Sequence, residues 1–190
     1  MENNHTVISQ GFRYLLEALA PYIARELEIE YGENWWQIAV LDKLYDDQKR
    51  DLPVSGDWGT LVDSLDIQRC LLLFDLYWIQ VFRKKLSIDH RTWAKELTGV
   101  RNRLAHIGGQ DFSDDDTWRA LDTMSRLCEQ LDAESAEEIR ALLREVRYGS
   151  AKGSTNVVQT NSATAEESAA ASEELSGQAQ ILKGLISQFK

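Results

Sequence analysis

A long apolar stretch in the middle of the chain constrains the fold most strongly. Over residues 64–86 the pattern predicts one helix whose side chains are apolar on nearly every side. A helix of this kind must be buried on every side, so we expect it to be the central helix of the domain, with one face open to a second subunit. The most apolar part, 70–82, contains Asp75 and Gln80 and is too short to span a bilayer.

Apolar residues recur at helical spacing along most of the first 147 residues. Residues 7–30 predict one helix, or two half-helices because Pro21 lies inside the pattern. Gly32 follows at a position typical of a helix end. Further helices are expected at about 35–48, 90–106, 113–131 and 133–147, with a loop at 49–60. The predicted fold class is therefore all-α, a helical bundle of five to six helices with short connections.

Two local clusters allow more than one interpretation. Trp35 and Trp36 could form a stacking platform for nucleic-acid bases, but paired tryptophans are more often core aromatics, and we expect the core. The three aspartates at 114–116 could be taken for a metal site. They follow Ser113, however, and capping of a helix N-terminus accounts for all of them. We therefore expect no metal.

Composition and charge limit the functions that the chain can have. Apolar residues make up 43% of a chain with a formal net charge of −10, which indicates a globular protein and excludes a broad nucleic-acid-binding surface. RNA binding would depend on a small basic site, such as Arg101 with Arg103 or the run at 83–85. Cys70 and Cys128 lack metal-ligand spacing, and we expect buried thiols in a reducing compartment. With no signal peptide, we expect a cytoplasmic protein.

The sequence Arg-Asn-Arg-Leu-Ala-His at 101–106 is the strongest candidate for a catalytic site. On a helix, Asn102 and His106 lie one turn apart and Arg101 lies beside Asn102. Imidazole transfers protons near neutral pH, and guanidinium matches phosphate oxygens. The three side chains suit phosphodiester cleavage, with Asn102 positioning a neighbour. From residue types alone, a structural role for a basic helix end with a hydrogen-bonded histidine is the commoner explanation.

Residues 100–106 match the signature of the HEPN superfamily, in which an Arg and a polar residue precede a His by three residues of any kind. Blocks at 11–36 and 112–122 resemble the branch found in bacterial anti-phage ATPases and in a nuclear RNA-surveillance endonuclease. The resemblance spans about 7–147. It implies a metal-independent endoribonuclease that cleaves single-stranded RNA by 2′-OH attack, in toxin or anti-phage defence.

The resemblance also implies roles for individual residues. The catalytic residues would be Arg101, Asn102 and His106, with His106 transferring the proton and Arg101 holding the phosphate. Arg101 and Arg103 are the candidate phosphate-binding residues. Two copies of the motif usually face each other across a homodimer in this superfamily, so we expect a homodimer with RNA as substrate. We expect no cofactor, no DNA substrate and no membrane partner.

The composition changes after residue 147. Residues 148–154 predict a flexible linker, natural or engineered, and residues 155–190 follow a heptad pattern with mostly Ala and Ser at the seam. Residues 157–175 are similar to the C-terminal end of methyl-accepting chemotaxis receptors, which makes Glu167 a candidate methylation site, although Ala171 replaces the usual Ser or Thr. A lone helix of this kind cannot bury its apolar side chains, so we expect a coiled-coil partner.

A second function from a different class fits the same sequence. The domain at 1–147 could be a non-catalytic HEPN module for dimerisation or interaction, with 155–190 as a coiled-coil signalling or assembly tail. The acidic net charge favours this alternative, and the intact motif at 101–106 favours the nuclease.

Overall fold

The computed structural model describes residues 3–105 and 112–149, and within these ranges every regular element is helical. Contacts divide the chain into two units, Met1–Arg147 and Tyr148–Lys190. His106, the linker from residue 150 onward, the heptad segment 155–190 and Glu167 lie outside the described residues.

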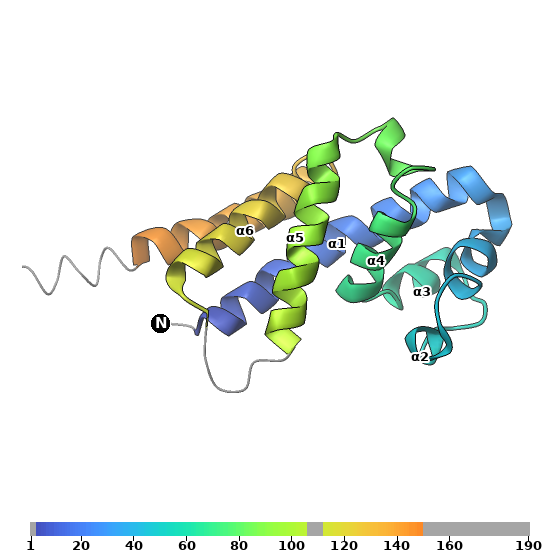
Figure 1. Ribbon diagram of the computed structural model, residues 1–190, viewed down its shortest axis with the longest axis horizontal. Helices are drawn as coiled ribbons and strands as arrows, with labels where there is room; N and C mark the ends of the chain where they lie inside the picture. The colour runs from blue at the N-terminus through green and yellow to red at the C-terminus, as the bar shows by residue number, and fades with distance from the viewer. Residues whose placement is uncertain (1–2, 106–111, 150–190) are drawn as a thin grey trace, which may run out of the picture. The chain divides into compact units, whose positions relative to one another are not determined.

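Four helices form the body of this unit (Figure 1). They are α1 (Asn4–Tyr31), α4 (Ile67–Leu76), α5 (Ile88–Ala105) and α6 (Asp114–Cys128). Helix α1 packs against α4 and α6, and α5 packs against the same two helices, so the four close into a bundle. Residues 133–149 are also helical. The prediction of an all-α bundle is confirmed.

Shorter elements join these helices. A 3-10 turn, η1 (Gly32–Asn34), and a π-helix, η2 (Trp36–Leu41), follow α1. Two short helices come next, α2 (Asp46–Lys49) and α3 (Trp58–Asp63), and a 3-10 turn, η3 (Phe82–Lys84), precedes α5. The single helix predicted at 35–48 is therefore wrong, and the predicted loop at 49–60 ends where α3 begins. Helical periodicity detects apolar spacing but does not separate π, 3-10 and α turns.

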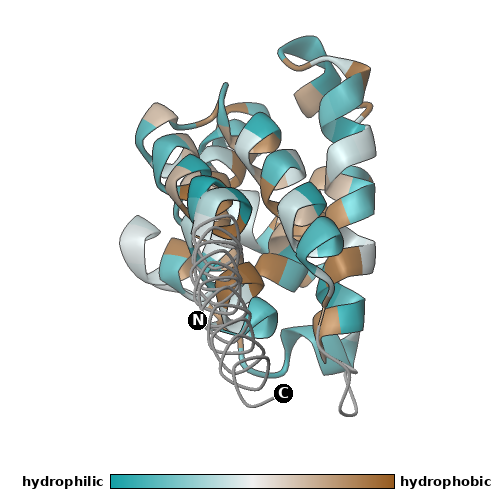
Figure 2. Ribbon diagram, turned by 90° about the vertical axis from the view of Figure 1, so that its left-hand side faces the viewer, coloured by the Kyte–Doolittle hydropathy of each residue, from teal (hydrophilic) through white to brown (hydrophobic). Residues whose placement is uncertain are grey.

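Helix α1 is continuous over 28 residues despite Pro21. The Asn3 side chain caps its first turn by accepting from the His5 backbone N–H at 2.7 Å. Gly32 ends it with a φ of 70°, a conformation that costs glycine little. The stripe that includes Ile8, Leu15 and Leu19 is fully buried, as the spacing predicts. Figure 2 shows that hydrophobic and hydrophilic residues are also interspersed along the other helices.

The single helix predicted over 64–86 is wrong. Helix α4 ends at Leu76, and a wider turn follows in which the Phe82 and Arg83 N–H groups donate to the carbonyls of Tyr77 and Trp78, five residues back. This change turns Phe82 into the core, where its ring stacks on Phe74 at 4.7 Å between centroids. The expectation of burial on every side also fails. Leu72, Leu76 and Ile79 are 38%, 49% and 62% exposed.

Other expectations about the core are confirmed. Trp35 and Trp36 are buried against each other, and the Trp36 indole N–H donates to the Pro53 carbonyl at 2.8 Å. Both cysteines are free and buried. Ser113 caps α6 by accepting from the Asp116 N–H at 3.1 Å. Of the helices in the described ranges, none combines the length and apolar character that a bilayer crossing requires.

Candidate functional site

The candidate site begins at the last described turn of α5. Leu97 is fully buried and Leu104 packs against the core, which fixes this end of the helix. Arg101 is half-buried and Asn102 is exposed. The Arg101 Nη1 lies 3.4 Å from the Asn102 Oδ1, a long contact that leaves the other guanidinium N–H groups for a ligand. Ala105 is the last described residue here, and His106 follows it in the sequence.

Arg101 lines a hollow of about 430 Å³. The start of α1, the start of α4 and the end of α5 form its walls. Its lining residues are His5, Ser9, Phe12, Arg13 and Leu16 from α1, Asp66 and Ile67 at the start of α4, and Arg101, Leu104 and Ala105 from α5. The structure thus places the motif arginine beside basic and polar groups that lie about ninety residues away in sequence.

The α1 residues of this hollow did not appear among the sequence-based candidates. A signal for them exists, because His5, Ser9 and Arg13 follow one another at intervals of four and therefore share one face of α1. Nothing local in the sequence says that this face lies beside Arg101. That relationship depends on how α1 and α5 are placed in the bundle.

Arg103 lies on a different side of α5 from Arg101, as expected for positions about 200° apart on a helix. Its Nη1 is 2.9 Å from the Asp116 Oδ2, and its guanidinium lies 4.2 Å from the centre of the Phe112 ring. It lines a separate hollow of about 260 Å³. The hydrogen bond from Arg103, with a further one from Ser113, lowers the pKa of Asp116. The structure does not bring the two candidate phosphate-binding arginines together.

The basic run at 83–85 also lies apart from Arg101. Lys84 Nζ pairs with Glu30 at 2.8 Å and Lys85 Nζ with Glu26 at 2.7 Å. These carboxylates are 13 or more residues beyond Arg13 on α1, a separation of about 20 Å or more along the helix. Most of the charge of this run is therefore neutralised by α1, away from the hollow.

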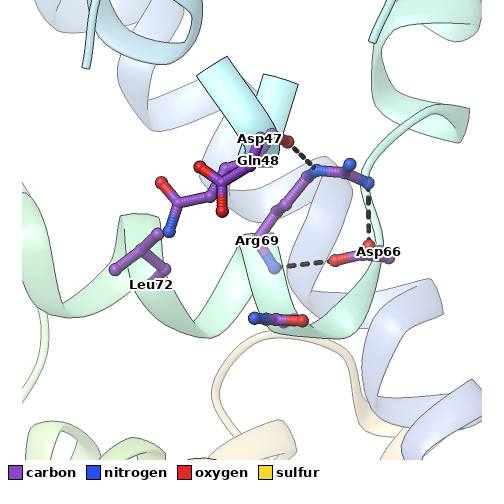
Figure 3. Close-up of a pocket in the computed structure, with 6 residues that line it drawn as sticks. Asp47, Gln48, Asp66, Arg69 and Leu72 are labelled. Atoms are coloured by element: carbon purple, nitrogen blue, oxygen red, sulfur yellow. Dashed lines mark hydrogen bonds and ion pairs between the residues drawn. The ribbon is translucent and has the colours of Figure 1, made fainter. Parts of the chain in front are cut away.

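The acidic residue of the hollow, Asp66, forms an ion pair with Arg69, and Figure 3 shows this pair in a second pocket that Asp66 also lines. Arg69 Nη1 lies 2.8 Å from the Asp66 Oδ2, and Arg69 Nε donates to the Gln48 carbonyl at 2.8 Å. Asp66 also caps α4 by accepting from the Arg69 backbone N–H. Among the described residues that line the hollow, Asp66 is the one carboxylate. Its charge is shared with Arg69, so it does not cancel Arg13 and Arg101.

His90, also on α5, has the contacts of a residue that stabilises the core. It is buried, its Nδ1 lies 2.9 Å from the Ser87 Oγ, and its ring contacts Trp93 at 5.0 Å between centroids. Burial lowers the pKa of this imidazole. The His90 ring is a packing group near the start of α5, at the opposite end of the helix from Arg101.

A helical domain whose last described turn of α5 carries an arginine and a polar residue, with a histidine following at this spacing in the sequence, has the features of a HEPN domain. The chain belongs to the Swt1-like HEPN family, whose sequence model matches residues 10–132. Neither a curated protein nor a solved structure matches the chain. The family match does not extend to residues 155–190, and their resemblance to chemotaxis receptors stays a prediction.

Proposed function

We propose that this protein is a metal-independent endoribonuclease that cleaves single-stranded RNA by attack of a ribose 2′-OH. One observation carries the proposal. Arg101 and Ala105, the last described residue before His106, both line the hollow at the end of α5. A phosphate held there by Arg101 would lie beside the start of the segment that carries the motif histidine.

The reaction requires two proton transfers. The 2′-OH loses its proton to a general base as its oxygen attacks phosphorus, and the bond to the 5′-oxygen breaks as that oxygen gains a proton. The products are a 2′,3′-cyclic phosphate and a free 5′-OH. His106 performs one of these transfers, Arg101 stabilises the developing phosphorane charge, and Asn102 orients a neighbouring group.

A homodimer completes this mechanism. One motif supplies one histidine, and the resemblance to the HEPN superfamily implies that the facing motif of a second copy supplies the other proton-transfer group. We place this activity in the cytoplasm, in toxin or anti-phage defence, because the blocks at 11–36 and 112–122 resemble domains with that role. The heptad segment 155–190 would add a coiled-coil contact to the assembly.

The decisive experiment incubates the purified full chain with end-labelled single-stranded RNA in EDTA and identifies the product ends by mass spectrometry. Cleavage that persists and leaves 2′,3′-cyclic phosphate supports the proposal. Activity that needs a divalent metal, or equal cutting of DNA, would refute the mechanism.

The second candidate function is a non-catalytic interaction module. Leu72 and Leu76 lie one turn apart on α4 and Ile79 follows that helix, and these exposed apolar side chains favour an interaction module, because contiguous apolar patches commonly mark protein contacts. The net charge of −10 also disfavours RNA binding over a wide surface. A well-folded dimer that cleaves no RNA would support this alternative.

A further inference from the structure

The polar face at the start of α1 has no role in the reaction described so far. His5, Ser9 and Arg13 line the same hollow as Arg101, and Figure 1 places the first turns of α1 and the last turn of α5 at the same end of the bundle. We infer that this hollow binds one nucleotide of a single-stranded RNA next to the scissile phosphate, with Arg13 as a second phosphate contact. The inference rests on the proposed nuclease function.

The charges of the hollow favour an anion. Arg13 and Arg101 reach it from two different helices, and the Asp66 carboxylate is already paired with Arg69 at 2.8 Å. A local positive site of this kind lets a chain with a net charge of −10 hold a phosphate without a basic surface elsewhere. Arg13 and Arg101 can contact consecutive phosphates of one strand.

The present partners of Arg13 do not hold it firmly. Its Nε lies 4.0 Å from the Glu17 Oε1, and the side chains of Arg13 and Glu17 are 62% and 59% exposed. The guanidinium also lies 5.1 Å from the centre of the Tyr14 ring. Exposed ion pairs of this geometry contribute little to stability. The Arg13 side chain can therefore turn toward a phosphate at little cost.

The rest of the lining favours a nucleotide over a simple anion. Leu16, Ile67 and Leu104 are only partly buried and give the hollow an apolar wall. An apolar wall accepts the face of a base or a ribose, as in other ligand sites of roughly 300–1,000 Å³. The Ser9 hydroxyl donates to the His5 backbone carbonyl at 2.8 Å, and its oxygen can still accept a hydrogen bond beside this wall.

The test measures binding without cleavage. The probe is a short, mixed-sequence 2′-O-methyl RNA, which lacks the attacking hydroxyl, and its fluorescence anisotropy is followed with the full chain over a range of salt concentrations. Arg13→Ala should weaken binding roughly fivefold at about 0.1 M salt and reduce the slope of log K against log salt by about 0.7, the value for one phosphate contact on a single strand.

Arg25→Ala is the matched control, because Arg25 is an exposed arginine of the same helix that does not line the hollow. It makes the same change in net charge and should leave the affinity and the slope unchanged. Inorganic polyphosphate should compete more weakly than the oligonucleotide at equal charge. Equal competition would mean that the apolar wall plays no part, and would overturn the nucleotide site.

The outcomes separate this inference from the proposed function. If the wild-type chain cleaves RNA but Arg13→Ala matches it in affinity and slope, the nucleotide site is refuted and the nuclease stands. If the wild-type chain binds the probe with the expected Arg13 dependence but cleaves no RNA, the nuclease fails and the binding site stands. No binding of the probe by the wild-type chain overturns the inference.

Discussion

Arg103 of α5 and Asp116 of α6 form an ion pair of 2.9 Å that links the end of one helix to the first turn of the next. The Phe112 ring lies under the same guanidinium. Although Arg103 belongs to the motif segment, its contacts tie together the two helices on either side of residues 106–111. These contacts indicate that Arg103 contributes to the stability of the domain.

Arg103→Ala should therefore lower the free energy of unfolding by about 1 kcal/mol, the combined size of an exposed ion pair and an exposed cation–π contact. Urea unfolding followed by circular dichroism measures this change. Arg119→Ala is the control, because the Arg119–Glu96 pair of 2.7 Å also joins α6 to α5 but, among the described residues, has no cation–π contact. An equal effect of both substitutions would mean that the contact with the Phe112 ring adds nothing to stability.

The same pair predicts how stability depends on pH. The pKa of Asp116 is lowered in the folded protein, mainly by the hydrogen bond from Arg103. Its stabilising effect is therefore fully present above the ordinary pKa of an aspartate, about 4, and is lost as the pH falls through the lower folded value. Asp116→Asn should reduce the difference in unfolding free energy between about pH 7 and about pH 3. An unchanged difference would refute this assignment.

His106→Ala and Arg101→Ala should each reduce RNA cleavage by ~10²–10⁴-fold, the usual contribution of a general acid or base. Asn102→Ala should have a smaller effect, since its expected role is to orient a neighbour. Cleavage assays measure the rates, and circular dichroism shows whether each variant is folded. Wild-type activity in the His106 variant would remove the histidine from the mechanism.

Sedimentation of the wild-type chain at micromolar concentration should show a homodimer. The exposed apolar group at Leu72, Leu76 and Ile79 is the surface that we expect to be covered. The double substitution Leu76→Ser and Ile79→Ser should shift the equilibrium toward the 21.7 kDa monomer. Val54→Ser, at a position 80% exposed, is the control and should not. A wild-type chain that sediments only as a monomer would contradict the prediction.

Deletion of residues 150–190 should leave the 1–147 domain folded, with a nearly unchanged melting temperature. The helices within residues 3–149 bury a continuous core among themselves, and the Ala- and Ser-rich heptad seam offers little apolar area for further burial. Differential scanning calorimetry of the two chains tests this. A large decrease in melting temperature would mean that the tail stabilises the domain.

The features that were predictable from sequence depend on local patterns. The buried stripe of α1 and the cap at Ser113 follow from residue spacing and residue type, and the structure has both. The end of α4 at Leu76 was not predictable, because the apolar run continues into wider turns that remain buried at Phe82. The motif identified Arg101. The placement of Arg13 in the same hollow depends on how α1 and α5 pack together, which local sequence patterns do not reveal.

The packing of Gly11 against α6 affects where α1 holds Arg13. A Cβ atom at this position would lie 2.7 Å from the Leu121 Cδ2 and 2.8 Å from the Met124 Sδ, so α1 packs closely against these two α6 side chains because position 11 has no side chain. Ser9 and Arg13 lie about 200° around the helix from Gly11, on the opposite face. A larger side chain at position 11 would force the Leu121 and Met124 side chains to shift, and whatever they do not absorb would move α1, and with it Arg13, relative to Arg101. The separation between these two arginines is therefore set in part by a residue that touches neither of them.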